Sequence, residues 1–143
     1  MNPILRNALA VVVGWLIGSL VNSGVVMLNG TLIALPEGTD VSTMEGLRAA
    51  MPFFEPIHFL IPFLSHAIGT LVGAIIASRM ASANGMTQAI IVGFLFFAGG
   101  IVANVIMFDG PLWFTLTDLL LAYFPMAYLG GILGGKKTLK VKN

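Results

Sequence analysis

Residues 58–80 read HFLIPFLSHAIGTLVGAIIASRM, and this stretch decides the fold class. A helix needs about 20 predominantly apolar residues to cross a bilayer. The stretch is long enough, and its single basic residue, Arg79, stands at its edge. Because charged side chains are costly inside a membrane, the segment predicts a transmembrane helix.

Three further apolar segments contain no Lys or Arg: 8–33, 87–108 and 112–134. Only 9% of the 143 residues are charged and 57% are hydrophobic, whereas a soluble domain carries about 25% charge. We therefore predict an all-α polytopic membrane protein, a four-transmembrane-helix bundle that forms a single membrane domain over residues 1–143. The apolar stretch that follows Arg6 is too long for a signal-peptide core, so we expect it to be a retained span.

The bulk composition also excludes several classes of protein. The net charge is +1 and no cysteine is present. A nucleic-acid partner requires a basic face, which this chain lacks. Without cysteine there can be no disulfide, thiolate metal site or cysteine nucleophile. The expected partner is the lipid bilayer.

The charged residues predict the orientation of the bundle, because loops rich in Lys and Arg stay in the cytoplasm. Basic residues lie near both termini and beside the loop at 81–86: Arg6, Arg79, Lys136, Lys137, Lys140 and Lys142. The other side carries five acidic residues and one basic residue: Glu37, Asp40, Glu45, Glu55, Asp109 and Arg48. We expect both termini, including the tail 135–143, to be cytoplasmic, and the membrane to be the bacterial inner membrane.

The outer loop 35–57 is the one sizeable segment outside the spans. Ser42-x-x-Glu45 is typical of a capping box at a helix start, and Pro52 ends the segment. Between them, apolar residues recur at helical spacing, which predicts a short helix on the outer interface. The sequence leaves open whether this helix is a connector or a lid.

Small residues four apart occur on three of the spans: Gly14 and Gly18, Gly69 and Gly73, and Gly130 and Gly134. Such pairs let two helix backbones pack closely in lipid. We predict that they are helix-packing positions. Because four spans have few internal partners for so many small-residue faces, a homo-oligomer or a membrane protein partner is also expected.

Each span carries one polar residue that is expensive in lipid: Asn22, His66, Asn104 and Asp118. At a rise of about 1.5 Å per residue, all four fall roughly 6–15 Å below the outer surface. Ionisable groups inside a span are functional candidates by default. The sequence predicts a binding or permeation site with His66 and Asp118 as its ionisable centre, or else an interhelical hydrogen-bonded pair that only holds helices together.

One face of the second span extends this pattern outward. Glu55 and His58 fall on the same helical face as His66 and are predicted to form the entrance. Glu55-x-x-His58 is also the spacing of a carboxylate–histidine metal motif, but a second motif is missing, so a metal site there is a minor alternative. Pro62 and Pro125 are predicted kinks or hinges.

The chain resembles small uncharacterised four-span bacterial integral membrane proteins. The segment from Leu35-Pro36-Glu37-Gly38 through Phe63-Leu64-Ser65-His66-Ala67 is its most distinctive part. The likeness implies a four-span fold and carries no function. In length and span number the chain is also similar to small multidrug-resistance transporters and fluoride channels, but it lacks their motifs.

The leading functional expectation is a channel- or transporter-like protein for an ion, proton or small solute, acting through the polar site in the outer half of the bundle. A non-catalytic scaffold or accessory subunit of a membrane complex is the alternative. An interfacial enzyme acting on a lipid or quinone is a third reading, although no nucleophile elbow, phosphate loop or dinucleotide fingerprint is present. No cofactor is expected.

Overall fold

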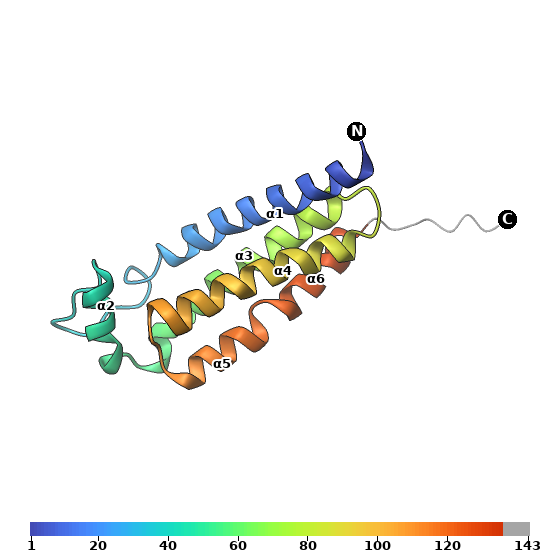
Figure 1. Ribbon diagram of the computed structural model, residues 1–143. Coiled ribbons are helices and arrows are strands. Elements are labelled where there is room, and N and C mark those ends of the chain that lie inside the picture. The colour runs from blue at the N-terminus through green and yellow to red at the C-terminus, as the bar shows by residue number, and fades with distance from the viewer. Residues whose placement is uncertain (136–143) are drawn as a thin grey trace.

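A computed structural model describes residues 1–135, and over that range the chain is helical and contains no strand. The long helices are α1 (Pro3–Val26), α3 (Leu60–Met80), α4 (Gly85–Ile101), α5 (Leu112–Leu121) and α6 (Phe124–Gly134), arranged as an elongated bundle (Figure 1). Four helical stretches are long and apolar enough to cross a membrane: Pro3–Val26, Pro56–Met80, Gly85–Met107 and Leu112–Gly134. The prediction of four long apolar helices is confirmed, and their length and composition indicate a membrane protein.

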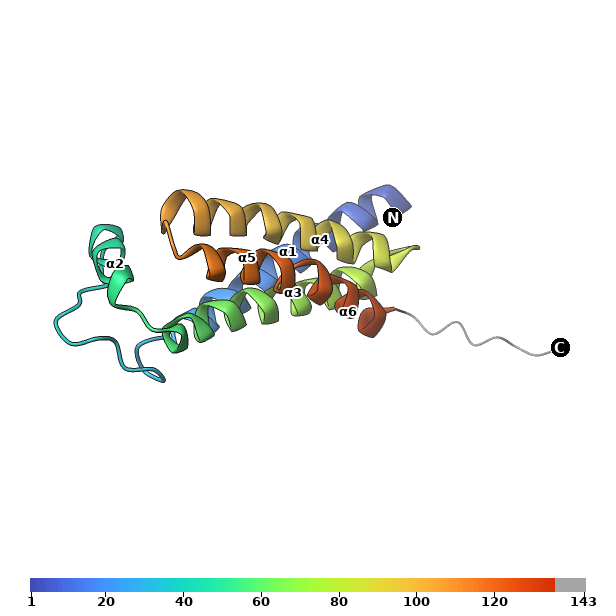
Figure 2. The same cartoon turned by 90° about the horizontal axis from the view of Figure 1, so that it is seen from below.

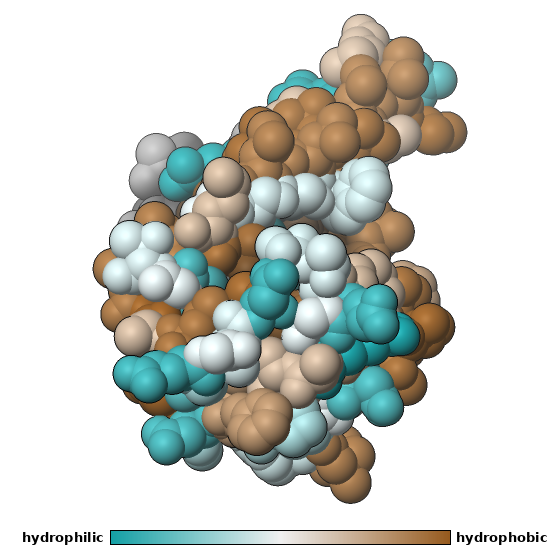
Figure 3. Space-filling view, turned by 90° about the vertical axis from the view of Figure 1, so that its left-hand side faces the viewer, coloured by the Kyte–Doolittle hydropathy of each residue, from teal (hydrophilic) through white to brown (hydrophobic). Residues whose placement is uncertain are grey.

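The bundle has two different ends. One, the loop end, holds residues 27–59 and the turn between η3 (Val102–Met107) and α5. The other, the terminal end, holds the N-terminus, the α3–α4 turn and the end of α6 (Figure 1). Viewed onto the loop end, hydrophilic residues gather over its surface and hydrophobic residues lie along its margins (Figure 3). Of the predicted tail 135–143, all but Gly135 lies outside the described residues.

The first helix lies earlier in the chain than the predicted span 8–33. Asn2 caps its start by accepting a hydrogen bond from the Ile4 N–H at 2.9 Å, and Pro3 occupies the first turn, where its missing N–H has no cost. The helix ends at Val26, and the chain then turns through Gly30, whose φ of +72° suits glycine. The predicted limits of this span were wrong, because hydropathy identifies apolar residues and does not show which of them are helical.

The outer loop contains the short helix α2 (Met44–Ala50), followed by the 3₁₀ turns η1 (Met51–Phe53) and η2 (Pro56–Phe59). Its N-cap is Thr43, whose Oγ1 accepts the Gly46 N–H at 3.0 Å. The Ser42 N–H instead donates to Oδ1 of Asp40, one step before the helix. The helix was therefore predicted correctly, but its cap lies one residue later because Ser42 stabilises the preceding turn.

The predicted glycine pairs bring α3 into backbone contact with α1 and α6. A Cβ built on Gly14 would lie 2.5 Å from the Gly73 carbonyl oxygen, and one on Gly18 would lie 2.5 Å from that of Gly69. On the other side of α3, a Cβ on Gly134 would lie 2.5 Å from the Ile75 carbonyl oxygen, and Gly130 meets Ala74 and Leu71 in the same way. These small-residue faces are therefore occupied within one chain and no longer argue for self-association.

Burial in the bundle is the reverse of that in a soluble protein. The buried side chains of α3 are mostly small, whereas large apolar side chains such as Leu20, Ile106 and Leu120 are 65–72% exposed. A water-soluble domain does not expose so much continuous apolar surface. This arrangement suits a lipid environment, where helix association depends on close packing of small residues.

Two of the apolar stretches are irregular. Residues 102–107 form the π-helix η3 (Val102–Met107), in which the Phe108 N–H bonds the Ala103 carbonyl five residues back at 2.9 Å. The fourth stretch breaks at Ala122–Tyr123 into α5 and α6, and Pro125 stands in the first turn of α6 immediately after the break. Pro62 lies in the first turn of α3, where no intrahelical hydrogen bond is lost, and α3 continues without interruption.

Candidate functional site

The carboxylate of Asp118, on α5, is the centre of a buried group of polar side chains. Asp118 is fully buried and accepts hydrogen bonds from three neighbours. Asn104 Nδ2 donates to Oδ2 at 2.6 Å, and the Tyr123 hydroxyl donates to the same oxygen at 2.7 Å. His66 Nδ1 lies 2.9 Å from both carboxylate oxygens. We refer to His66, Asn104, Asp118 and Tyr123 as the polar cluster.

Both helix irregularities supply members of the polar cluster. The π-helix η3 carries Asn104, and π-helical turns change which side chains a helix presents at one level. On a regular helix, Asp118 and Tyr123 would point about 140° apart, given about 100° per residue. The break at Ala122–Tyr123 changes that direction, and the Tyr123 hydroxyl reaches the carboxylate.

Tyr123 is the member of the polar cluster that the sequence analysis missed. Its side chain is only 1% exposed, so its hydroxyl needs a buried partner. The available signal was a tyrosine deep in an apolar span, a few residues from a carboxylate and just before a proline. Gly100 makes room for it, since a Cβ at that position would collide with the phenol.

The contact with Asp118 defines the tautomer of His66. A carboxylate is an acceptor, so the imidazole Nδ1 must carry a proton to bond with it. The Tyr123 hydroxyl oxygen also lies 3.0 Å from Nδ1. The second ring nitrogen, Nε2, has no hydrogen-bond partner among residues 1–135. This arrangement leaves Nε2 available as a hydrogen-bond acceptor or as a proton-binding site.

Beside His66 lies a cavity of about 320 Å³ at the loop end of the bundle. Residues of α1 and η3 line it, and α1 diverges from the end of α4 and η3 in both views of the bundle (Figure 1, Figure 2). Since a water molecule occupies about 30 Å³ of liquid, this space corresponds to about ten waters or a small organic molecule. The lining residues are Asn22, Val26, Asn29, Leu47, Met51, Phe54, His58, Phe59, Pro62, His66, Ala103, Asn104, Phe108, Gly110 and Phe114.

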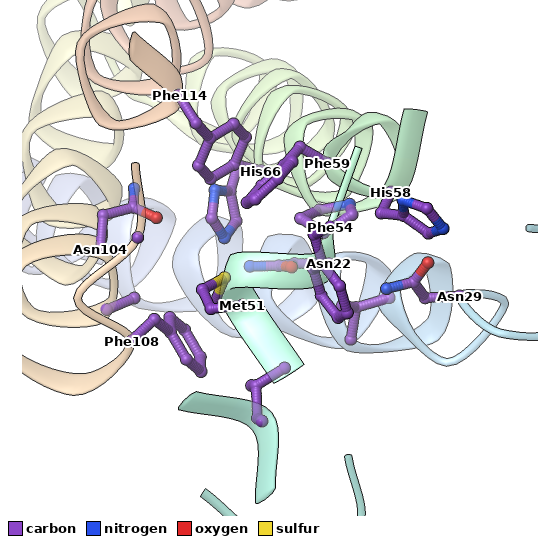
Figure 4. A pocket seen from close by; sticks show the side chains of 15 residues that line it. Asn22, Asn29, Met51, Phe54, His58, Phe59, His66, Asn104, Phe108 and Phe114 are labelled. Carbon is purple, nitrogen blue, oxygen red and sulfur yellow. The ribbon is translucent and has the colours of Figure 1, made fainter. Parts of the chain in front are cut away.

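The close-up of the cavity shows polar side chains from three different elements around one space: Asn22 from α1, His66 from α3 and Asn104 from η3 (Figure 4). Four phenylalanine rings, Phe54, Phe59, Phe108 and Phe114, complete much of the wall. The lining therefore combines apolar aromatic surface with a few hydrogen-bonding groups, which is the usual composition of a small-molecule site.

Of the four predicted polar residues, the structure joins three directly and the fourth indirectly. His66, Asn104 and Asp118 are hydrogen-bonded to one another through the carboxylate. Asn22 lines the same cavity but has no hydrogen bond to the cluster. Asn29, from the turn after α1, also lines the cavity, and its Oδ1 is buried without a partner among the described residues.

The predicted entrance residues have different positions. His58 lines the cavity, but the backbone already occupies both of its ring nitrogens: Nδ1 accepts the Glu55 N–H at 2.9 Å, and Nε2 lies 3.1 Å from the Ala34 carbonyl. Glu55 is exposed and does not line the cavity. His58 thus joins the chain before α2 to the start of α3, so it cannot bind a metal without losing these bonds. In the described part of the chain, no group of three His, Asp or Glu side chains is suited to hold a metal ion.

The helix α2 covers the cavity at the loop end. Leu47 and Met51 contribute to its lining. The guanidinium of Arg48 holds α2 in place by donating from Nε to the Met107 carbonyl at 2.6 Å and from a terminal nitrogen to the Ile106 carbonyl at 3.1 Å. One arginine thereby satisfies two carbonyls at the end of η3, which would otherwise lack partners.

Comparison with known proteins finds no family model, curated protein sequence or solved structure that matches this chain. The function must therefore be argued from the geometry of the cavity and the polar cluster.

Proposed function

We propose that this protein is a small membrane protein of the transporter type, which binds a small organic solute in the cavity beside His66. The observation that carries the proposal is the position of the His66 imidazole. Asp118 and Tyr123 hold the ring at Nδ1, so that Nε2 is the free polar atom of a ring that lines an aromatic cavity. Orienting a histidine from behind with a carboxylate is how proteins prepare the other nitrogen for a ligand or proton.

Packing toward the terminal end favours a solute-binding cavity over an open ion pore. Beyond the polar cluster, the backbones of α1 and α3 meet at Gly14 and Gly73, and those of α3 and α6 meet at Gly134 and Ile75. Such contacts leave no room for a hydrated ion between these helix pairs. A cavity near one end of the bundle, with close backbone packing toward the other end, is compatible with alternating access.

The charges support an orientation with the loop end outside. Arg6 and Arg79 belong to the terminal end, where the Arg6 Nε donates to the Met80 carbonyl at 2.8 Å. The acidic residues of the outer loop belong to the loop end. By the positive-inside rule, the terminal end then faces the cytoplasm, and the cavity lies in the outer half of a bundle in the bacterial inner membrane, with α2 on the outer interface.

A cavity-filling substitution tests the proposal. Ala103→Leu places a larger side chain in the cavity wall, whereas Ala98→Leu adds the same atoms to an exposed position of α4. Binding is measured by calorimetry in mild detergent with three probes of similar size: 2-phenylethanol, benzyltrimethylammonium and benzenesulfonate. We expect at least one probe to bind the wild type, with affinity reduced at least tenfold by Ala103→Leu and unchanged by Ala98→Leu.

Transport is measured separately, as uptake of the radiolabelled permanent ions into proteoliposomes. The transporter assignment is supported if the wild type takes up an ion, Ala103→Leu abolishes this uptake and Ala98→Leu preserves it. If no probe binds, or if both leucine variants bind like the wild type, the cavity is not a solute site and the proposal fails.

A further inference from the structure

Two imidazoles line the cavity, those of His58 and His66, and the one bonded to a carboxylate is His66. Within residues 1–135, no Lys, Arg, Asp or Glu lines the cavity. Asp118 lies directly behind the imidazole, and its other two donors, Asn104 and Tyr123, are neutral. The site therefore has a formal charge of zero when His66 is an imidazolium and of −1 when His66 is neutral.

The groups that face His66 from the packed elements leave no other source of positive charge. The titratable ones are Asp118 on α5 and Tyr123 at the α5–α6 break. Asn22 on α1 and Asn104 on η3 are amides and do not titrate. His58, which also lines the cavity, has both ring nitrogens on backbone groups. Arg48 donates to the carbonyls of Ile106 and Met107 and does not line the cavity.

The walls of the cavity suit a cation. The faces of phenylalanine rings carry negative potential, and aromatic cages are used to recognise quaternary ammonium groups. Four phenylalanine side chains line this cavity, from the outer loop (Phe54), η2 (Phe59), the residue after η3 (Phe108) and α5 (Phe114). The ring of Phe54 stacks on that of His58, and the ring of Phe59 packs against that of Phe114. The nearby amide oxygens, including the unpartnered Oδ1 of Asn29, are acceptors and add no positive charge.

We propose that the cavity binds an organic ammonium ion and that this binding displaces a proton from His66, so that one cation exchanges for one proton beside Asp118. The inference rests on the proposed function and names the solute class of the same site. In the exchange, the proton leaves Nε2 of the imidazolium for water, while Nδ1–H keeps its bond to the carboxylate. No electron is transferred and no covalent bond forms to the ligand.

Electrostatics makes the exchange reciprocal. Two positive charges within one apolar site repel each other strongly, and only one is needed to compensate Asp118. By linkage, a proton that weakens cation binding is itself bound more weakly when the cation is present, by the same factor. Raising the pH removes the competing proton and strengthens cation binding. If one proton is displaced for each cation bound, the Kd of the cation rises by up to tenfold for each unit by which the pH falls.

The test compares a permanent cation, a neutral molecule and an anion on the intact protein. Benzyltrimethylammonium carries no proton of its own, so any proton released must come from the protein. Its affinity and that of 2-phenylethanol and benzenesulfonate are measured by calorimetry between about pH 5 and pH 8, where histidine normally titrates. The chain has only two histidines, His58 and His66. Of the three probes, we expect only the cation to bind with a Kd that falls as the pH rises. Its binding should release up to one proton per ligand bound.

Three variants assign the effect. His66→Gln keeps an amide donor for Asp118 without a titratable ring, and should bind the cation with a Kd that no longer depends on pH. Asp118→Asn removes the carboxylate. It should weaken the affinity for the cation at least tenfold and change the affinity for 2-phenylethanol less than threefold. Glu55→Gln removes an exposed carboxylate outside the cavity and should leave the pH slope in place.

Failures of the two proposals are distinguishable. If 2-phenylethanol binds in the cavity but the cation binds no better and shows no pH slope, the cation–proton exchange is overturned while the solute site stands. A pH slope that persists in His66→Gln would likewise overturn it, even if Asp118→Asn fails to fold. If none of the three probes binds, the proposed function itself is refuted.

Discussion

Removing the hydroxyl of Tyr123 should destabilise the protein far more than removing that of Tyr128. The two tyrosines lie on either side of Pro125 but differ completely in environment. The Tyr123 hydroxyl is buried and donates to Oδ2 of Asp118 at 2.7 Å. Tyr128 is 55% exposed and has no hydrogen bond within the described chain. Tyr123→Phe and Tyr128→Phe therefore delete the same atom from a buried charged contact and from a free surface.

The magnitude follows from the contact. A hydrogen bond to a charged group contributes about 1.5–3 kcal/mol in soluble proteins. In membranes the average side-chain hydrogen bond contributes only about 0.6 kcal/mol and the largest about 1.7, because the unfolded chain also finds partners. Asp118 keeps His66 and Asn104 as hydrogen-bond partners after the substitution. We therefore expect Tyr123→Phe to cost about 1.5 kcal/mol, roughly a tenfold change in the unfolding equilibrium.

Unfolding in mixed detergent micelles, followed by tryptophan fluorescence during titration with a denaturing detergent, measures this difference. Tyr128→Phe should lie within about 0.5 kcal/mol of the wild type, as is usual for surface substitutions. If the two variants lose equal stability, the Tyr123 hydroxyl does not make the contact with Asp118, and the polar cluster described above is wrong.

Two further substitutions test the packing and the covering helix. Gly14→Ala should separate α1 from α3, because the new Cβ would meet the Gly73 carbonyl, and cost about 1–3 kcal/mol in the same unfolding assay. Gly24→Ala, which meets nothing within 4 Å, should be neutral or slightly stabilising, and a comparable loss there would contradict the packing. Arg48→Gln removes the guanidinium that bonds the last carbonyls of η3, and should speed amide hydrogen exchange in α2 and η3 without affecting α6. Unchanged exchange in α2 would mean that this contact does not hold the helix over the cavity.

The sequence anticipated the long helices because lipid imposes a simple requirement: each crossing needs a long apolar segment. That requirement says little about where a helix starts or ends. The first helix begins at Pro3 and ends at Val26, since an asparagine cap and a glycine turn mark its limits more sharply than hydropathy does. The glycine spacing likewise identified positions of close helix contact. It did not show that α3 would pack against both α1 and α6.

The candidate site was predictable in part. His66, Asn104 and Asp118 were chosen because polar groups are expensive in lipid, and they do meet at one carboxylate. Asn22 was chosen on the same grounds and lines the cavity without joining them. Spacing on a regular helix placed Glu55 and His58 beside the site, but His58 lies in a 3₁₀ turn and bonds the backbone, while Glu55 is exposed.

The amino-acid sequence by itself determined that the chain forms four long apolar helices with a polar residue on each, because these properties depend on local composition. Only the tertiary structure decided which polar groups meet. The π-helix carries Asn104, and the break before Pro125 turns Tyr123 toward Asp118. Periodicity assumes a regular helix, whereas the site forms where two helices depart from regularity to satisfy one buried carboxylate.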